Sequence, residues 1–443
     1  DKREFGGKEE LFQRELETIF ARNWLFLTHD SLIPSPGDYV TAKMETGVDE
    51  VIVSRQNDGS IRAFLNVCRH RGKTLVHAEA GNAKGFVCSY HGWGFGANGE
   101  LQSVPFEKEL YGEALDKKCM ETGLKEVARV ESFHGFIYGC FDEEAPSLKD
   151  YMETGDAGWY WEPMETFKHS GGLELIGPPG KVIIKANWKA PAENFVGDAY
   201  HVGWTHASSL RTGQSVFSSL AGNAALPPEG AGLQMETTSK YGSGMETGVL
   251  WDGYSGAHSA DLVPELMETA FGGAKQERLN KEIGEVRARI YRSHLNGTVF
   301  PNNSFLTCSG VFKVWHPIDA NTTEVWTYAM ETVEKDMETP EDLKRRLVDA
   351  VQRTFGPAGF WESDDNDNME TETESQNAKK YQSRDGDLIS NLGFGGDVYG
   401  DEVYPGVVGK SAIGETSYRG FYRAYGAHIS SSSWDILGPP STP

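Results

Sequence analysis

Two short segments of the sequence each place a cysteine close to a histidine. Cys68 and His70 form the first pair, and Cys88 and His91 form the second after seventeen intervening residues. Thiolate and imidazole groups on two short loops can together provide four ligands to a metal centre. Gly72 follows the first pair, and glycines also follow the second, so the backbone can approach a bound centre and direct amides at its sulfurs. The pattern predicts a metal site rather than two incidental buried cysteines.

The spacing leaves the metal open between one zinc ion and a two-iron cluster. Cys-x-His is tight for one tetrahedral ion, because zinc loops usually place two or more residues between ligands. The spacing of these four residues better matches a two-iron cluster, with both cysteines on one iron and both histidines on the other. Cys68-x-His70 with Cys88-x-x-His91 resembles the Rieske [2Fe–2S] motif. That resemblance implies a cluster whose histidine ligands raise its reduction potential.

Three basic residues, Arg69, Arg71 and Lys73, surround the first pair. One interpretation is a solvated basic patch. The other is a positive charge that stabilises the reduced cluster or docks an acidic electron donor.

A second group of candidate ligands lies between residues 194 and 206. On one continuous helix Asn194, Asp198 and His201 would share a face. His201 and His206 would lie about 140° apart at roughly 100° per residue, so one regular helix would not direct both at one ion. Gly203 between them predicts a break that lets them converge. With a distant carboxylate they would form the facial triad of non-haem Fe(II) oxygenases; the alternative is two histidines on a helix surface.

The carboxylate of such a triad must come from another part of the chain. The candidate is Asp364-Asp365, and Glu362 and Asp367 are not excluded by residue chemistry alone.

From about Leu11 to about Trp434 the chain resembles the α-subunits of Rieske non-haem iron ring-hydroxylating dioxygenases, in particular the naphthalene dioxygenase group. The residues that carry the resemblance are the two cysteine–histidine pairs and the series Asn194, Asp198, His201, His206, Glu362, Asp364 and Asp365. It implies that His201, His206 and Asp365 bind a mononuclear iron. It also implies that Asp198 connects its own His201 to His91 of a neighbouring chain, and that Asn194 lies near the iron without clearly ligating it.

The resemblance also implies a reaction and partners. These enzymes cis-dihydroxylate an aromatic hydrocarbon (naphthalene-like, polycyclic or nitroarene) with O2, using electrons from NAD(P)H that arrive through a reductase and a ferredoxin. A small β-subunit in an α3β3 hexamer is expected. Because an apolar arene offers no hydrogen-bonding group, its recognition rests on shape and dispersion. The resemblance places nine residues around the substrate: Phe195, Val202, Phe217, Ala257, His294, Asn296, Leu306, Phe355 and Trp361.

Two functions from other classes compete with the oxygenase. One is a non-catalytic Rieske electron carrier joined to a binding domain, which predicts no second iron site. The other is a zinc-stabilised scaffold, which predicts a colourless protein.

The composition limits the class of protein. Of 443 residues, 38% are hydrophobic and 11% aromatic, which excludes a disordered chain. The formal charge of −23 argues against nucleic acid as the main partner. No apolar run approaches the roughly 18 residues of a membrane-spanning helix. Five cysteines, an odd and widely spaced set, are a poor disulfide framework and indicate the reducing cytoplasm.

All ten methionines are followed by Glu-Thr, a regularity that ordinary residue frequencies do not produce. We interpret these twenty residues as foreign to the natural sequence and assign them no function. Without the ten glutamates the 65 acidic residues become 55, and against 42 basic residues the formal charge becomes −13.

Two scaffolds must position these side chains. Strand-like runs at 38–42, 50–55, 61–67 and 132–141 predict an all-β domain that carries the cluster on two loops. Further along, strand-like runs at 173–176, 181–185, 310–315 and 323–329 occur with helical runs at 192–205, 276–295 and 341–354. The acidic stretch 362–368 predicts a solvated loop.

The predicted class is α+β, with a small all-β Rieske domain inserted in a larger, helix-grip-like catalytic domain of antiparallel sheet plus helices. The expected boundaries are 1–31 for the N-terminal helical part of the catalytic domain, 32–151 for the Rieske domain and 152–443 for the catalytic domain. The tail after Trp434 is assigned no function.

Overall fold

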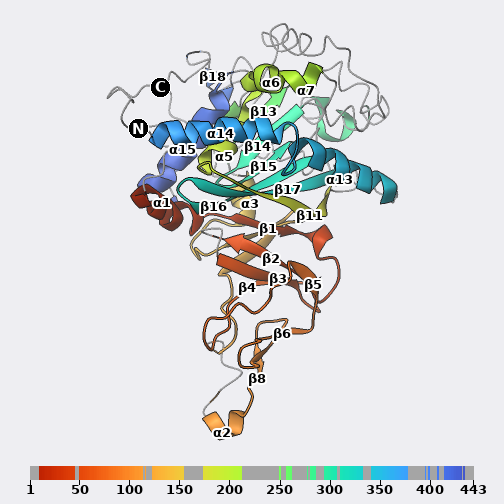
Figure 1. The fold of residues 1–443 in the computed structure, drawn as a ribbon, viewed down its shortest axis with the longest axis vertical. Coiled ribbons are helices and arrows are strands. Elements are labelled where there is room, and N and C mark those ends of the chain that lie inside the picture. Colours follow the sequence, from red (N-terminus) through yellow and green to blue (C-terminus); the bar gives the residue numbers. More distant parts are fainter. Residues whose placement is uncertain are drawn as a thin grey trace. The chain divides into compact units, whose positions relative to one another are not determined.

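The computed structural model describes residues 9–44, 49–112, 115, 122–153, 173–211, 249–250, 256–261, 277, 280–285, 294–306, 310–332, 341–377, 395, 398–399, 407–408, 414–431 and 433–434. The chain forms two compact units, residues 20–148 and residues 1–19 with 149–443 (Figure 1). The N-terminal segment thus groups with the larger unit. In the part of the chain that is described, no helix is long and apolar enough to cross a membrane.

The unit of residues 20–148 consists mainly of short antiparallel strands. Its three sheets are β1 (Leu25–His29), β10 (Phe136–Cys140) and β9 (Arg129–Phe133); β4 (Ile61–Leu65), β3 (Asp49–Arg55), β2 (Asp38–Met44) and β5 (Ala80–Asn82); and β6 (Gly85–Val87), β7 (Gly94–Gly96) and β8 (Leu101–Ser103). The short helices η2 (Asp30–Leu32) and α2 (Glu107–Tyr111) also belong to it. The predicted strand 132–141 is interrupted, because His134 and Gly135 turn with positive φ between β9 and β10.

The larger unit is built on a nine-stranded antiparallel sheet. Its order is β11 (Leu173–Ile184), β17 (Thr322–Thr332), β16 (Val311–Asp319), β15 (Asn303–Leu306), β14 (His294–Val299), β13 (Gly256–Asp261), β12 (Val249–Leu250), β19 (Val407–Val408) and β18 (Val398–Tyr399). The predicted runs 173–176 and 181–185 join in one strand, β11, whose register with β17 shifts between Ile176 and Gly180.

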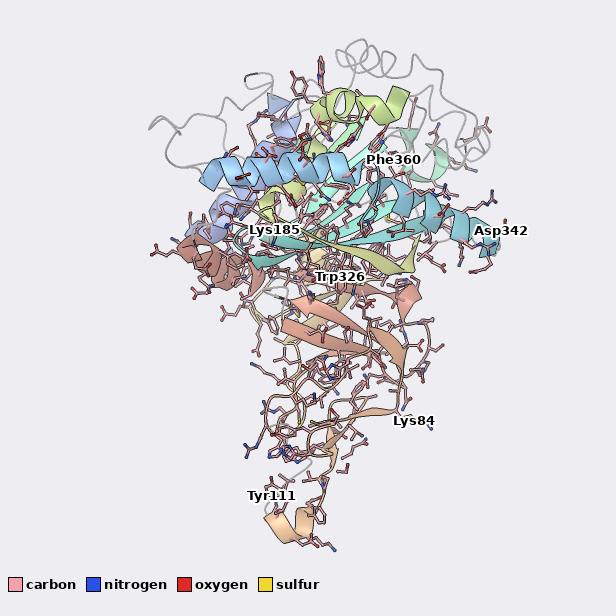
Figure 2. All side chains as sticks on the ribbon, in the orientation of Figure 1. Lys84, Tyr111, Lys185, Trp326, Asp342 and Phe360 are labelled. Carbon is pink, nitrogen blue, oxygen red and sulfur yellow. The ribbon has the colours of Figure 1, made fainter. Side chains whose placement is uncertain are left out.

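Among the described residues, the helices that accompany this sheet include α1 (Glu9–Glu15), the π-helix η1 (Leu16–Phe20), α3 (Leu148–Glu153), α5 (Lys189–Gly197), α6 (Ala199–Thr205), α7 (Ala207–Arg211), α13 (Glu341–Phe355), α14 (Glu362–Asn377) and α15 (Thr416–Ser430). Helix α5 packs on β13–β15 and α13 on β17, while α14 contacts α5. Phe360, labelled in Figure 2, lies in the short connection between α13 and α14.

The predictions for residues 192–205, 276–295 and 362–368 are wrong. The helical run 192–205 is two helices, α5 and α6, that separate at Asp198. The helical run 276–295 ends too late, because His294 and Leu295 already belong to strand β14.

The acidic stretch 362–368 is the first half of helix α14 rather than a loop. The buried positions of α14 follow helical spacing but are mostly polar: Glu362, Asp365, Met369 and Thr373. A search for apolar periodicity therefore misses this helix. Acidic side chains in the first turn also favour a helix, because they lie near the positive end of its dipole.

Candidate metal centres

The two cysteine–histidine loops have the same backbone hydrogen bonds. The N–H of Cys68 donates to the carbonyl five residues on at 2.8 Å, and the N–H of Gly72 donates back to the Cys68 carbonyl at 2.9 Å. Cys88 and Gly92 make the equivalent bonds at the same distances. Gly72 and Gly92 have φ of 72° and 70°, a left-handed conformation that glycine adopts without steric cost. Two loops built alike thus present two cysteines from one compact core.

The four candidate ligands are arranged in like pairs. The Cys68 and Cys88 thiols lie within hydrogen-bonding reach of each other, and each is approached by backbone N–H groups of its own loop. The His70 and His91 rings are 4.6 Å apart between centroids. Burial raises the pKa of the Cys68 thiol. His70 Nδ1 is buried, and among the described residues it has no hydrogen-bond partner, as expected of an atom that binds a metal.

A single zinc ion does not fit this arrangement. Within the described residues, the one group of three or more candidate ligand atoms that gathers within 4.8 Å lies elsewhere, so no three of these four side chains surround one point. Thiol beside thiol and imidazole beside imidazole is the pairing that a two-iron cluster needs.

The histidine side of this centre faces the surface. Cys68 and Cys88 are buried, whereas His91 is exposed and His70 is half-buried. The indole of Trp93 stacks on the His70 ring at 5.0 Å with 6° between the planes. Tyr111, labelled in Figure 2, meets the Trp93 ring at 80°. These contacts fix the orientation of His70 while His91 stays accessible.

The second centre begins where α5 passes into α6. Asp198 lies between the two helices with φ −79° and ψ 72°, and its carboxylate accepts the N–H of His201 at 3.2 Å as the cap of α6. The His201 Nδ1 lies 2.6 Å from the Asp198 carbonyl oxygen and 3.3 Å from a carboxylate oxygen. The prediction of a break at Gly203 is wrong, because α6 runs through it to Thr205.

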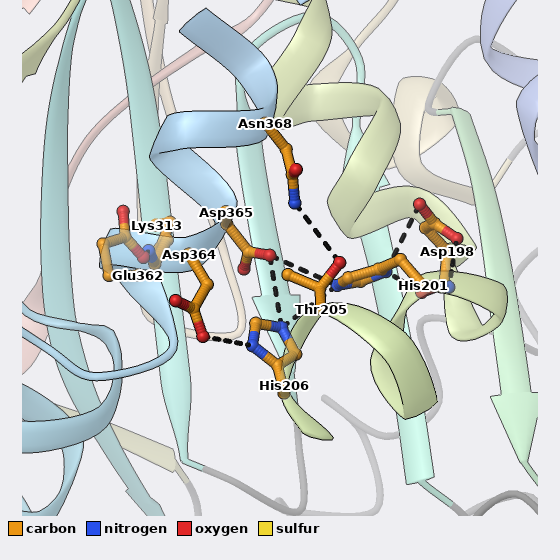
Figure 3. A network of polar contacts seen from close by, with 9 residues as sticks. All are labelled: Asp198, His201, Thr205, His206, Lys313, Glu362, Asp364, Asp365 and Asn368. Carbon is orange, nitrogen blue, oxygen red and sulfur yellow. Dashed lines mark hydrogen bonds and ion pairs between the residues drawn. The ribbon is translucent and has the colours of Figure 1, made fainter. Parts of the chain in front are cut away.

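His206 follows directly after the last residue of α6, which lets it turn toward His201. The two Nε2 atoms are 3.2 Å apart. Asp365 Oδ1 on α14 lies 3.3 Å from the Nε2 of His201 and 3.2 Å from that of His206 (Figure 3). A bond of 3.2 Å from Asn368 to Thr205 joins α14 to the end of α6 beside them.

These three atoms fit one metal ion. Bonds of about 2.1 Å at right angles would separate ligand atoms by about 3.0 Å, near the separations observed, and such facial geometry leaves other positions open. Asp365 is buried, and among the described residues no hydrogen bond satisfies its Oδ1. Three atoms with lone pairs that converge in this way repel one another unless a cation or a proton lies between them.

The carboxylates beside His201 favour its protonated form. Burial lowers the pKa of His201, but contacts with the carboxylates of Asp198 and Asp365 outweigh burial and raise the pKa to about 10. Burial likewise raises the pKa of Asp365, but the contacts with His201 and His206 outweigh it and hold the pKa well below its usual range. The two carboxylates thus favour positive charge at this site, which a bound cation would also supply.

The other acidic candidates lie differently around the triad. Asp364 Oδ2 is 3.7 Å from the Nδ1 of His206, on the far side of that ring from the triad. Glu362 is buried and receives a hydrogen bond from Lys313. Asp367 is exposed. Of these four carboxylates, the structure thus brings Asp365 alone to both Nε2 atoms.

Two of the predicted pocket aromatics lie in one connected group with His206, and a third packs separately. Trp361 stacks on the His206 ring at 4.4 Å with 7° between the planes, and Phe355 meets Trp361 at 74°. Phe195 on α5 packs edge-on against Trp315 at 5.2 Å.

The remaining predicted positions are placed less directly. Val202 and Asn194 are half-buried on α6 and α5, and Leu306 is buried at the end of β15. Strand register puts Asn296 opposite Leu306. Ala257 lies on β13 and His294 on β14, and Phe217 is outside the described residues.

Sequence reasoning missed Lys313. It lies on β16 within the run Val311–Trp315 and is fully buried. The signal was a charged residue between apolar neighbours in a strand, which indicates a buried cation with a partner.

One domain carries two cysteine–histidine loops, and the other unit carries a centre of two histidines and one carboxylate from α14. Together these two sites define a Rieske non-haem iron oxygenase. Residues 23–127 match the Rieske [2Fe-2S] domain family, and residues 154–431 match the family of ring-hydroxylating α-subunit catalytic domains. The chain belongs to the ring-hydroxylating dioxygenase α-subunits.

Known relatives are similar along nearly the whole chain. The large oxygenase component of the naphthalene 1,2-dioxygenase system of Pseudomonas aeruginosa is 93% identical over 97% of this chain and 91% of its own length. That of the 2,4-dinitrotoluene dioxygenase system of Burkholderia sp. (strain RASC) is 76% identical over 97% and 90%. A solved structure of naphthalene 1,2-dioxygenase with indole bound in the active site has a TM-score of 0.82 at 77% identity, over 97% of this chain and 92% of that one.

Proposed function

We propose that this chain is the terminal oxygenase subunit that cis-dihydroxylates an apolar aromatic hydrocarbon, with His201, His206 and Asp365 as ligands of its mononuclear iron. The observation that carries the proposal is the convergence of two Nε2 atoms and one buried carboxylate oxygen at 3.2–3.3 Å. The iron, when bound, supplies open coordination positions for the activation of dioxygen. Cys68, Cys88, His70 and His91 would hold the [2Fe–2S] cluster.

The side chains around the triad support an apolar substrate. Phe355 packs against Trp361 beside His206, and Phe195 packs against Trp315; we expect a flat hydrocarbon to bind among these aromatic side chains by dispersion. Trp361 also holds the His206 ring in one plane by stacking on it. The names of the relatives favour naphthalene and nitrotoluenes as the substrate class.

The partners follow from the relatives and from the exposed histidine. The relatives are large components of multi-component systems, so we infer a small subunit, a ferredoxin and a reductase that draws on NAD(P)H. His91 is exposed at the surface of its unit, where a partner has access to the imidazole side of the cluster site. Cys140 is a buried free thiol outside the cluster site, which fits a reducing cytoplasm.

Metal analysis with a visible spectrum separates this function from its rivals. Each cluster would add two irons and the triad one, so the oxygenase predicts about three irons per chain and a reddish-brown colour. About two irons per chain would support a Rieske carrier, and zinc without colour would support a scaffold.

A further inference from the structure

Lys313 and Glu362 form a buried ion pair beside the triad. Lys313 is fully buried on β16, and Glu362, the first residue of α14, is 3% exposed. The Lys313 Nζ donates to Glu362 Oε2 (Figure 3). A buried pair of charges is costly to desolvate and often adds little stability over apolar side chains of the same size. Its place next to the candidate iron site therefore points to a role in that site.

The pair joins a central strand to the first turn of the helix that carries Asp365. Lys313 is held within the sheet, where it pairs with Ser304 on β15 and Thr327 on β17. Glu362 and Asp365 are three residues apart in α14 and so lie on the same face. Fixing Glu362 against β16 thus limits rotation and sliding of α14 at the turn that directs Asp365 toward the two histidines.

The charge of Lys313 also has a local use. Its Nζ lies 5.1 Å from the ring centroid of Phe195, 5.4 Å from that of Trp315 and 5.8 Å from that of Phe355. Aromatic faces and one carboxylate therefore surround the ammonium. Because Lys313 balances the charge of Glu362, Asp365 has no unpaired carboxylate from Glu362 beside it on the same face of α14.

We propose that Lys313 and Glu362 are positioning residues that hold Asp365 at the mononuclear iron. This inference rests on the iron site proposed above. It concerns iron affinity and not the chemistry of the reaction, since neither side chain contacts the triad atoms.

The test measures Fe(II) affinity in the assembled enzyme after removal of the mononuclear iron, by anaerobic equilibrium dialysis. Lys313→Met is expected to raise the Fe(II) dissociation constant by about tenfold, the lower end of the loss that follows removal of a group bonded directly to a ligand, because Lys313 acts on Asp365 only through Glu362 and α14. Glu362→Gln, which keeps the shape and an acceptor for Lys313, is expected to have a smaller effect in the same direction. Visible absorption of the Rieske cluster, whose ligands lie in the other unit, should stay unchanged.

Two further variants separate positioning from general stability. Lys313→Met leaves Glu362 as an unpaired buried charge, which should lower the melting temperature. The double variant Lys313→Met/Glu362→Leu removes this charge, so its melting temperature should recover while the Fe(II) dissociation constant stays raised. The matched control is Glu15→Gln, which weakens an equally buried pair, Glu15 with Lys189 at 2.5 Å, at the far end of α5 from Asp198. It should lower the melting temperature without changing Fe(II) affinity.

The outcomes are distinct. Recovery of iron affinity in the double variant, or an equal loss in Glu15→Gln, would overturn the positioning role in favour of simple stability. Should Lys313→Met not fold, Glu362→Gln decides the matter, and unchanged affinity there overturns the proposal. If the parent enzyme binds no mononuclear Fe(II), the proposed function itself fails.

Discussion

Asp365 is the side chain that joins the two histidines into one site. Its Oδ1 is close to both Nε2 atoms, whereas the neighbouring Asp364 faces the opposite edge of the His206 ring. Residue chemistry could not choose between these adjacent aspartates. The choice depends on which carboxylate α14 turns inward; family resemblance predicted Asp365, and the folded helix brings Asp365 to both histidines.

Replacing each aspartate in turn tests this distinction. Asp365→Ala is expected to abolish mononuclear iron and activity, because it removes a ligand. Asp364→Ala is its matched control and should keep the iron, with affinity lowered by at most the roughly 10–100-fold of an outer partner. Iron content per chain is the measurement, with Rieske absorption constant in both. Iron retained in Asp365→Ala would show that the triad is assigned wrongly.

Fe(II) binding should depend on pH through His201. Contacts with two carboxylates outweigh burial and raise the pKa of His201 to about 10, so the metal-free site is protonated at neutral pH. A histidine ligand must be neutral to bind a metal, so binding releases this proton. The association constant is expected to rise about tenfold per pH unit between about pH 6.5 and 8.5. Dialysis of the iron-depleted enzyme at several pH values measures it, and a flat profile would contradict the protonated site.

The carboxylate of Asp198 has two contacts with His201: it accepts the His201 N–H as the cap of α6, and it places a negative charge near the His201 ring. Asp198→Asn keeps an acceptor for the N–H of His201 and so keeps the cap of α6, but it removes the charge near His201 Nδ1. Both metal centres should stay filled and the cluster should still be reduced, while product formation falls by at least about 10–100-fold. Turnover at the parent rate would refute the predicted role of Asp198 as the connection between its own His201 and His91 of a neighbouring chain. Loss of iron would limit Asp198 to structural support of His201.

At the scale of elements, the site depends on where helices begin and end. A glycine between His201 and His206 made Gly203 the natural place for a break, yet α6 continues through it. The break lies at Asp198, where an acidic cap competes with the helix, and His206 is freed because α6 ends at Thr205. Sequence spacing thus predicted the convergence of the histidines but not the residue that produces it.

The turn between α13 and α14 sets the direction of Asp365. A Cβ at Gly359 would collide with the carbonyl oxygen of Thr354, so glycine is required there. Gly359→Ala is expected to destabilise the fold by about 1–3 kcal/mol and to reduce iron content, because α14 must shift. Ala358→Gly, an exposed neighbour in the same turn, is the control and should keep the iron. Thermal unfolding measures the stability of both variants, and metal analysis measures their iron content. A destabilised Gly359→Ala that keeps its full iron content would show that the turn does not set the position of Asp365.

At the scale of the molecule, two centres are built in two different ways. Short motifs with fixed loops make the first, and such local geometry could be predicted from Cys68, His70, Cys88 and His91 alone. The second combines α6 with α14, more than 150 residues apart in the sequence. Its carboxylate was found through family resemblance, because long-range register and a polar buried helix face leave no periodic signal. The domain boundaries at 31 and 151 stay predictions.

The central claim is that this chain adds both atoms of dioxygen to an aromatic ring. The most direct measurement is turnover of naphthalene by the enzyme reconstituted with ferredoxin, reductase and NADH under ¹⁸O₂, with mass analysis of the product. The expected product is a cis-dihydrodiol that carries two ¹⁸O atoms, and the Asp365→Ala enzyme should form none. A product with one labelled oxygen, or cluster reduction without any oxygenated arene across naphthalene and nitrotoluenes, would contradict the account.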